Sequence, residues 1–149
     1  MTFDQTRLAL DGDTDVVIRR SFSHKPPQVW RALTDPALLR RWLSPDLIEC
    51  QIDPRPGGSF RYAWPALFFS GPILEARPPE RMVHVEHFNG DTKTGPTVTT
   101  TLWPAGPGTR MTVVMRYSDA QARATAIQQG FTDGIDQVYG RIEDLSFPA

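Results

Sequence analysis

The sequence has little cysteine, little net charge and no long apolar run, and each shortage excludes a class of protein. The chain of 149 residues has one cysteine, which cannot form an internal disulfide or supply a thiolate metal cluster. Its formal net charge is −1, whereas proteins that bind nucleic acid or anionic membranes carry a basic surplus or patch. No segment approaches the roughly 20 apolar residues of a membrane span, and the acidic residues near the N-terminus exclude a signal peptide. We therefore expect a soluble cytoplasmic protein with no nucleic-acid partner and no membrane span.

Proline is the residue in excess, because 14 of the 149 residues are proline, about twice the average usage of roughly 5%. A proline excess can indicate disorder, but 40% of the residues are hydrophobic and 10% are aromatic. Most prolines fall between predicted elements. Pro65 and Pro72 lie at awkward strand positions, which predicts an edge, a bulge or a pocket rim there. The sequence predicts one folded domain over residues 15–147, preceded by a tail or weak edge strand at residues 1–14.

Strand-like segments alternate with turn residues through most of the chain. Runs of β-branched and aromatic residues separated by proline and glycine turns are typical of an antiparallel meander. Two short helices follow the first strand: Pro27 begins one that stops at Asp35, and Pro36 begins another that ends at Ser44-Pro45. The predicted strands are Val16–Phe22, Leu47–Ile52, Ser59–Trp64, Phe69–Ala76, Met82–Phe88, Thr97–Trp103 and Met111–Tyr117.

The C-terminal part changes from a strand period to a helical period. Phe131, Ile135, Val138 and Ile142 recur at spacings of three and four residues, which predicts one helix from about residue 119 to 145. Such a helix would be roughly 40 Å long, enough to cross a whole sheet. One antiparallel sheet covered by one long helix is an α+β fold. A sheet that curls round a single helix leaves space for a small-molecule pocket between the two.

Several motifs resemble those of one known family, in order over residues 16–145. The segments VWRALTDPALLRRW, PGGSF and PPERMV resemble the activator-of-heat-shock-protein-90-ATPase-homologue-like family, within the START-like, polyketide-cyclase-like (SRPBCC) superfamily. The resemblance implies a helix-grip fold: a curved antiparallel sheet of about six to seven strands wrapped round a long C-terminal helix, with two short helices after the first strand. It does not imply one activity, because a shared fold does not fix function.

His84 and Glu86 are the main candidates for acid–base chemistry or for contact with a polar group of a ligand. They lie two residues apart on one predicted strand and therefore share a face of the sheet. Met82 and Phe88 would share this face and favour an inward orientation, as does the family resemblance. The valines between them favour the alternative, in which His84 and Glu86 face water. In a cavity, burial would shift both pKa values and suit acid–base work or the recognition of a polar ligand head.

We expect the protein to bind one small, largely apolar molecule, a lipid or an aromatic compound, between the sheet and the C-terminal helix. One alternative is an enzyme, a cyclase, dehydratase or hydrolase that uses His84 and Glu86 as acid and base. Another is contact with the Hsp90 chaperone, which the family name implies. His84 and His87 point to opposite faces, so no metal or other cofactor is expected; the chain is expected to be a monomer or homodimer. The predicted pocket residues are Tyr62, Trp64, Phe69, His84, Glu86, Met115, Phe131 and Ile135.

Overall fold

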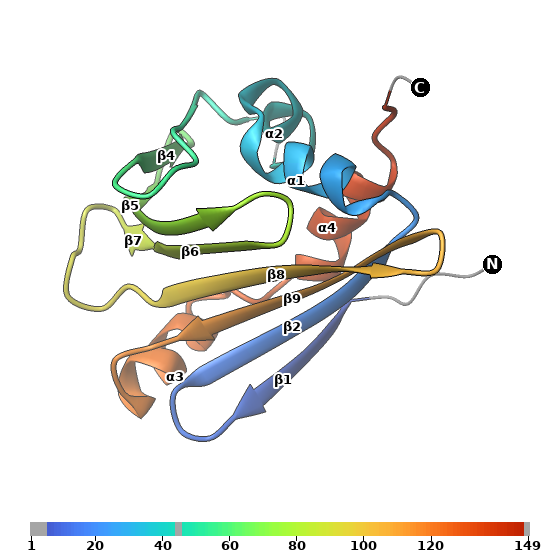
Figure 1. The fold of residues 1–149 in the computed structure, drawn as a ribbon. Coiled ribbons are helices and arrows are strands. Elements are labelled where there is room, and N and C mark those ends of the chain that lie inside the picture. Colours follow the sequence, from blue (N-terminus) through green and yellow to red (C-terminus); the bar gives the residue numbers. More distant parts are fainter. Residues whose placement is uncertain (1–5, 44–45, 148–149) are drawn as a thin grey trace.

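The computed structural model describes residues 6–43 and 46–147, which form one antiparallel sheet with helices packed against it. In this part of the chain the sheet has nine strands in the order β1-β2-β9-β8-β6-β5-β4-β3, and β7 pairs with β5 beside this path (Figure 1). The strands are β1 (Arg7–Asp11), β2 (Asp15–Phe22), β3 (Glu49–Ile52), β4 (Ser59–Ala63), β5 (Phe68–Arg77), β6 (Arg81–Val85), β7 (His87–Phe88), β8 (Thr97–Ala105) and β9 (Gly108–Arg116). The helices are α1 (Pro26–Thr34), α2 (Pro36–Leu43), α3 (Ala120–Gln128) and α4 (Ile135–Glu143).

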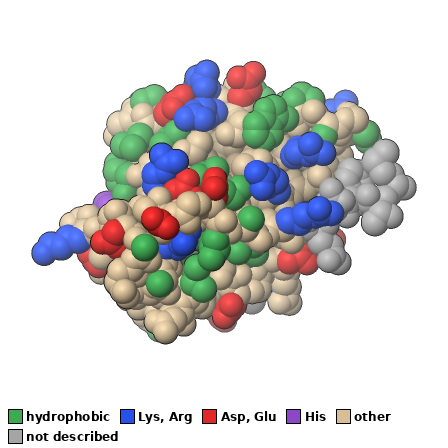
Figure 2. Space-filling model, turned by 90° about the horizontal axis from the view of Figure 1, so that it is seen from below, with side chains coloured by type: hydrophobic (Ala, Val, Ile, Leu, Met, Phe, Trp, Pro, Cys, Tyr) green, Lys and Arg blue, Asp and Glu red, His purple; other side chains and the backbone are tan. Residues whose placement is uncertain are grey.

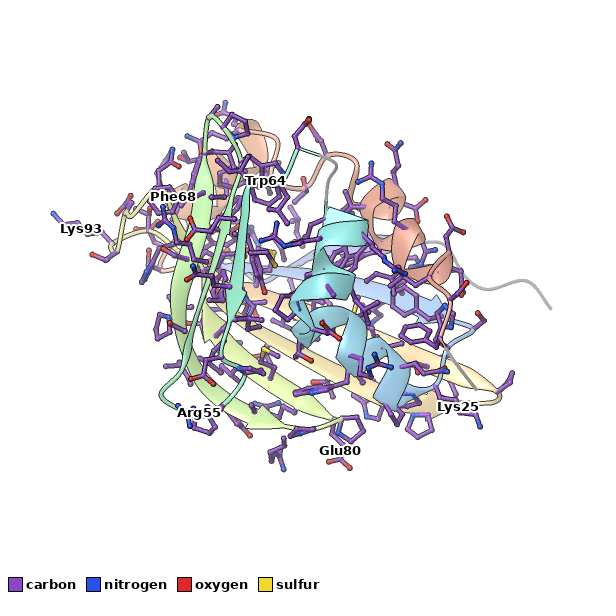
Figure 3. The ribbon with its side chains drawn as sticks, turned by 90° about the horizontal axis from the view of Figure 1, so that it is seen from above. Lys25, Arg55, Trp64, Phe68, Glu80 and Lys93 are labelled. Carbon is purple, nitrogen blue, oxygen red and sulfur yellow. The ribbon has the colours of Figure 1, made fainter. Side chains whose placement is uncertain are left out.

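The sheet curves so that helices cover its inner face. Figures 1 and 3 show α1 and α2 above β8 and β9, with β4 and β5 standing to one side of the two helices. The helix α4 contacts α2 and β2 and lies behind the front strands in Figure 1. This arrangement confirms the predicted α+β helix-grip fold.

Most predicted strands are present, with small shifts at their ends. The strand β1 lies within the segment predicted as a tail or weak edge strand, and it forms the edge of the sheet beside β2. The predicted strand Met82–Phe88 is divided into β6 and β7, and the Glu86 amide between them donates to the Pro96 carbonyl at 3.0 Å. The predicted end of the second helix at Ser44-Pro45 lies outside the described residues.

The C-terminal helix is shorter than predicted. Two helices, α3 and α4, occupy the region predicted as one, and residues 129–134 between them form turns. Gly130 and Gly134 have φ angles of +86° and +70°, which glycine adopts without steric cost and a right-handed helix excludes. Phe131 therefore lies in a turn and not in the middle of a helix.

The two short helices begin as the proline pattern predicts. Pro26 and Pro27 form the first turn of α1, where a missing N–H group costs nothing. Asp35 ends α1, and its carboxylate accepts a hydrogen bond from the Ala37 amide at 3.0 Å in the first turn of α2. The buried Trp42 indole N–H donates to the Ala32 carbonyl at 2.7 Å, which fixes α2 against α1.

The register of the sheet brings candidate residues into one row. Ile73 pairs with His84, His84 with Val98, and Val98 with Met115. Directly opposite residues in paired strands share a face, so these four side chains lie next to one another on the inner face. Ile73 and Val98 are buried. These four residues, the floor row, form the sheet side of the space between the sheet and the helices.

The surface seen from below carries side chains of every kind. Figure 2 shows acidic, basic and apolar side chains on this face, as a formal net charge of −1 leads us to expect. None of the helices in residues 6–43 and 46–147 is long and apolar enough to cross a membrane.

Candidate functional site

A cavity of about 370 Å³ lies between the inner face of the sheet and the helices α2 and α4. Its wall is mostly apolar, with Ile18 and Val113 from the sheet, Leu39 from α2 and Val138 from α4. This volume is within the range of about 300–1,000 Å³ that small-molecule sites occupy. All the residues that the sequence predicted for the pocket lie on the wall, although their binding of a ligand stays a prediction. They are Tyr62, Trp64, Phe69, His84, Glu86, Met115, Phe131 and Ile135.

His84 lies in the floor row with its ring packed edge-on against Phe60, at 5.0 Å between ring centroids. Its Nδ1 atom is buried and has no hydrogen-bond partner among the described residues. Burial disfavours the charged imidazolium and lowers the pKa of His84 to about 4. The ring is therefore uncharged at neutral pH and contributes polarity to the cavity without contributing charge.

Glu86 extends the same face beyond the end of β6. No hydrogen bond or ion pair joins its carboxyl group to another residue in the described part of the chain. Burial raises the pKa of Glu86 to about 7, because a surrounding of low dielectric disfavours the carboxylate anion. The inward orientation of His84 and Glu86 thus places a neutral imidazole and a half-ionised carboxyl group on one cavity wall.

Three tyrosines share the cavity with Glu86: Tyr62 from β4, Tyr117 directly after β9, and Tyr139 from α4. Burial raises the pKa of each hydroxyl, and the negative charge of Glu86 adds to each rise. All three hydroxyls are therefore protonated at neutral pH, and each can donate or accept a hydrogen bond. The cavity combines an apolar wall with several uncharged polar groups that a ligand can contact.

Four aromatic side chains pack together where the α3–α4 turn meets the sheet. The ring centroid of Phe69 is 6.1 Å from that of Trp64, 5.4 Å from that of Phe88 and 5.8 Å from that of Phe131. These pairs meet edge to face, the arrangement that the ring quadrupoles favour. Figure 3 shows Trp64 on the helix side of the sheet and Phe68 on the other side. The cluster holds the turn between the two C-terminal helices against β5.

Sequence reasoning missed four polar residues of the wall: Tyr117, Tyr139, Thr100 and Asp133. Strand alternation could have found Tyr117, two residues after Met115, because residues i and i+2 share a face. Helical spacing from the predicted position 135 could have found Tyr139. Asp133 gave no signal, since it lies in the turn that replaces the predicted helix. No three His, Cys, Asp or Glu side chains gather into a metal-binding group within residues 6–43 and 46–147.

The sequence of residues 23–146 matches the family described as Activator of Hsp90 ATPase homolog 1-like protein. The chain belongs to this family. The resemblance carried by its motifs is therefore confirmed, and the matched segment supplies most of the cavity wall. No match was found among curated proteins.

Solved structures similar to this Activator of Hsp90 ATPase homolog 1-like chain share its whole fold. A protein from Rhodobacter sphaeroides is 28% identical, with a TM-score of 0.84, over 94% of this chain and 96% of that chain. A protein from Nitrosomonas europaea is 26% identical, with a TM-score of 0.78, over 91% and 95%. CalU16 from Micromonospora echinospora is 26% identical, with a TM-score of 0.67, over 95% and 87%. The similarities support the family and the helix-grip fold, and they name no ligand.

Proposed function

We propose that the protein binds one small, largely apolar molecule in the cavity between the sheet and α4. The observation that carries the proposal is a cavity of about 370 Å³ with an apolar wall and with polar groups that lack protein partners. The buried Nδ1 atom of His84 has no hydrogen-bond partner within the described residues, and the carboxyl group of Glu86 makes no hydrogen bond or ion pair there. Buried polar groups in folded proteins are almost always hydrogen-bonded, so the unpartnered Nδ1 atom supports a ligand that supplies the missing partner.

The proposal is tested by screening lipids, sterols and aromatic polyketides by thermal shift and native mass spectrometry. A ligand at 100 times its Kd stabilises the folded state by about 2.7 kcal/mol, which raises the Tm of a domain of this size by about 5 to 10 °C. Ile135→Trp would place a larger side chain in the cavity, whereas Ile48→Trp adds the same volume at an exposed position. We expect Ile135→Trp to reduce the shift and Ile48→Trp to keep it. The proposal fails if no compound class binds, or if Ile135→Trp binds as the unmodified protein does.

Acid–base catalysis on a bound apolar substrate is a second candidate, favoured by the pKa of Glu86 at about 7. A general acid or base is most effective when its pKa lies near the working pH. Glu86 would carry the proton in such a cyclase, dehydratase or hydrolase, because the His84 ring is neutral at that pH. Glu86→Gln would then abolish turnover while the substrate still binds. Equal turnover by Glu86→Gln and the unmodified protein would exclude this role.

The family description also names the Hsp90 ATPase. Contact with the chaperone is a separate question from ligand binding, because it requires an outer surface and not the cavity. A pull-down with Hsp90 and an ATPase assay test it directly. Ile135→Trp would leave chaperone contact unchanged while it weakens ligand binding, which separates the two functions.

A further inference from the structure

The described residues of the cavity wall include acidic groups but no Lys or Arg. Within the described part of the chain, the titratable residues on the wall are Glu86, Asp133, His84 and the tyrosines, and no Lys or Arg is among them. A ligand with a carboxylate or phosphate head would be buried without a countercharge, which is costly in a surrounding of low dielectric. This wall therefore disfavours fatty acids and other anionic amphiphiles.

We propose that the ligand is an apolar amine, whose ammonium group lies against the Glu86 carboxylate while its apolar body fills the cavity. This inference rests on the proposed function and adds the chemical class of the ligand. Glu86 has no cationic partner among the described residues, and an ammonium group supplies one. An opposite charge within a few ångströms stabilises a buried carboxylate and favours its ionised form, so the amine and the carboxylate stabilise each other.

The groups around Glu86 suit a cation. His84 is uncharged at neutral pH because burial lowers its pKa to about 4, so it does not repel an ammonium group. The three tyrosines that line the cavity with Glu86 come from β4, from the residue after β9 and from α4, and they carry aromatic rings and hydroxyl oxygens. Aromatic faces attract cations, and hydroxyl oxygens accept hydrogen bonds from N–H donors. Asp133, an exposed residue on the α3–α4 turn, adds a second negative charge to the wall.

A matched set of probes tests the inference. Two apolar bodies, naphthyl and decyl, are each prepared as a primary amine, an alcohol and a carboxylic acid, and Kd is measured by calorimetry at pH 7.5. We expect at least one amine to bind tenfold or more tightly than the alcohol with the same body, and the acids to bind most weakly. In Glu86→Gln the preference for the amine should disappear while the affinity for the alcohol is retained. Glu80→Gln, which removes the same charge from an exposed turn, should keep the preference.

The outcomes separate this inference from the proposed function. Equal affinity for each amine and its alcohol overturns the amine inference and leaves the binding of a small apolar molecule standing. Persistence of the amine preference in Glu86→Gln overturns the assignment of the ammonium group to Glu86. If none of the six probes binds and the wider compound screen also finds no ligand, the proposed function and this inference fail together.

Discussion

Glu86 should make the protein less stable as the pH rises from about 4.5 to 7. Its pKa rises from 4.5 to about 7 on burial, so between these values the folded protein holds a proton that the unfolded chain has released. A carboxyl group with a raised pKa contributes stability that is complete below pH 4.5 and is lost as the pH rises through 7. At about 1.4 kcal/mol for each pKa unit, the full loss is about 3 kcal/mol.

His84 should act in the opposite direction over nearly the same range. Its pKa falls from 6.5 to about 4 on burial, so between these values the unfolded chain binds a proton that the folded protein lacks. The contribution of His84 to the free energy of unfolding is therefore complete above pH 6.5 and is lost as the pH falls through 4. This loss is again about 3 kcal/mol. Between pH 4.5 and 6.5 the two slopes cancel, and the contributions of this pair leave the stability of the unmodified protein flat.

A variant that lacks one of these two ionisable groups should show the pH dependence of stability that the other contributes. Urea unfolding at half-unit steps from pH 4 to 8 should give a free energy of unfolding for Glu86→Gln that rises by about 3 kcal/mol between pH 4 and 6.5. His84→Phe should instead fall by about 3 kcal/mol between pH 4.5 and 7. The exposed Glu80→Gln is the control and should follow the unmodified protein. A flat profile for Glu86→Gln, matching the control, would refute the reasoning from burial.

Four further substitutions test the fold by urea unfolding. Gly71→Ala would place a Cβ atom 1.9 Å from a backbone carbonyl oxygen of β6 and should lower the free energy of unfolding by about 3 kcal/mol. Gly106→Ala is the control: its φ is +55° and the space around it is open, so the loss should be about 1 kcal/mol. Trp42→Phe removes the donor to a buried carbonyl of α1 and should cost about 2 kcal/mol; no loss would mean that the carbonyl finds another donor. Asp15 accepts two hydrogen bonds of 3.0 Å from Arg116, which lower its pKa, so Asp15→Asn should be less stable than the unmodified protein at pH 7. That difference should shrink as the pH falls below 4, because a lowered pKa gives stability that acid removes.

Strand alternation explains why the cavity floor could be predicted from the sequence. The side-chain period of a strand is two, so His84 and Glu86 share a face with Met82, while the valines between them left the inward choice to the family resemblance. The same rule places Tyr62 with Phe60 and Met115 with Tyr117. The pairing of these strands into a sheet, which aligns His84 with Met115 through Val98, depends on register and could not be derived from any one segment.

The division of the C-terminal helix could not be predicted from the apolar spacing. Phe131 and Ile135 both lie on the cavity wall, so the chain needs apolar side chains at these positions whether it is helical or turned between them. The spacing of three and four residues therefore continues across the turn. Gly130 and Gly134 carry the signal, because two glycines in a helix interior cost roughly 1 kcal/mol each relative to alanine. Their positive φ angles remove that conflict, because Gly130 lies after the end of α3 and Gly134 lies before the start of α4.

The cost of His84 and Glu86 argues that function, and not stability, accounts for these two side chains. Each side chain lowers the free energy of unfolding by about 3 kcal/mol at a pH where it is charged in the folded state. An apolar side chain at either position would continue the surface formed by Ile73, Val98 and Met115 and would remove that cost. Burial of ionisable groups without protein partners is typical of functional sites, where local stability is given up for chemistry. The cavity wall at His84 and Glu86 is therefore the part of this fold where a ligand should be sought first.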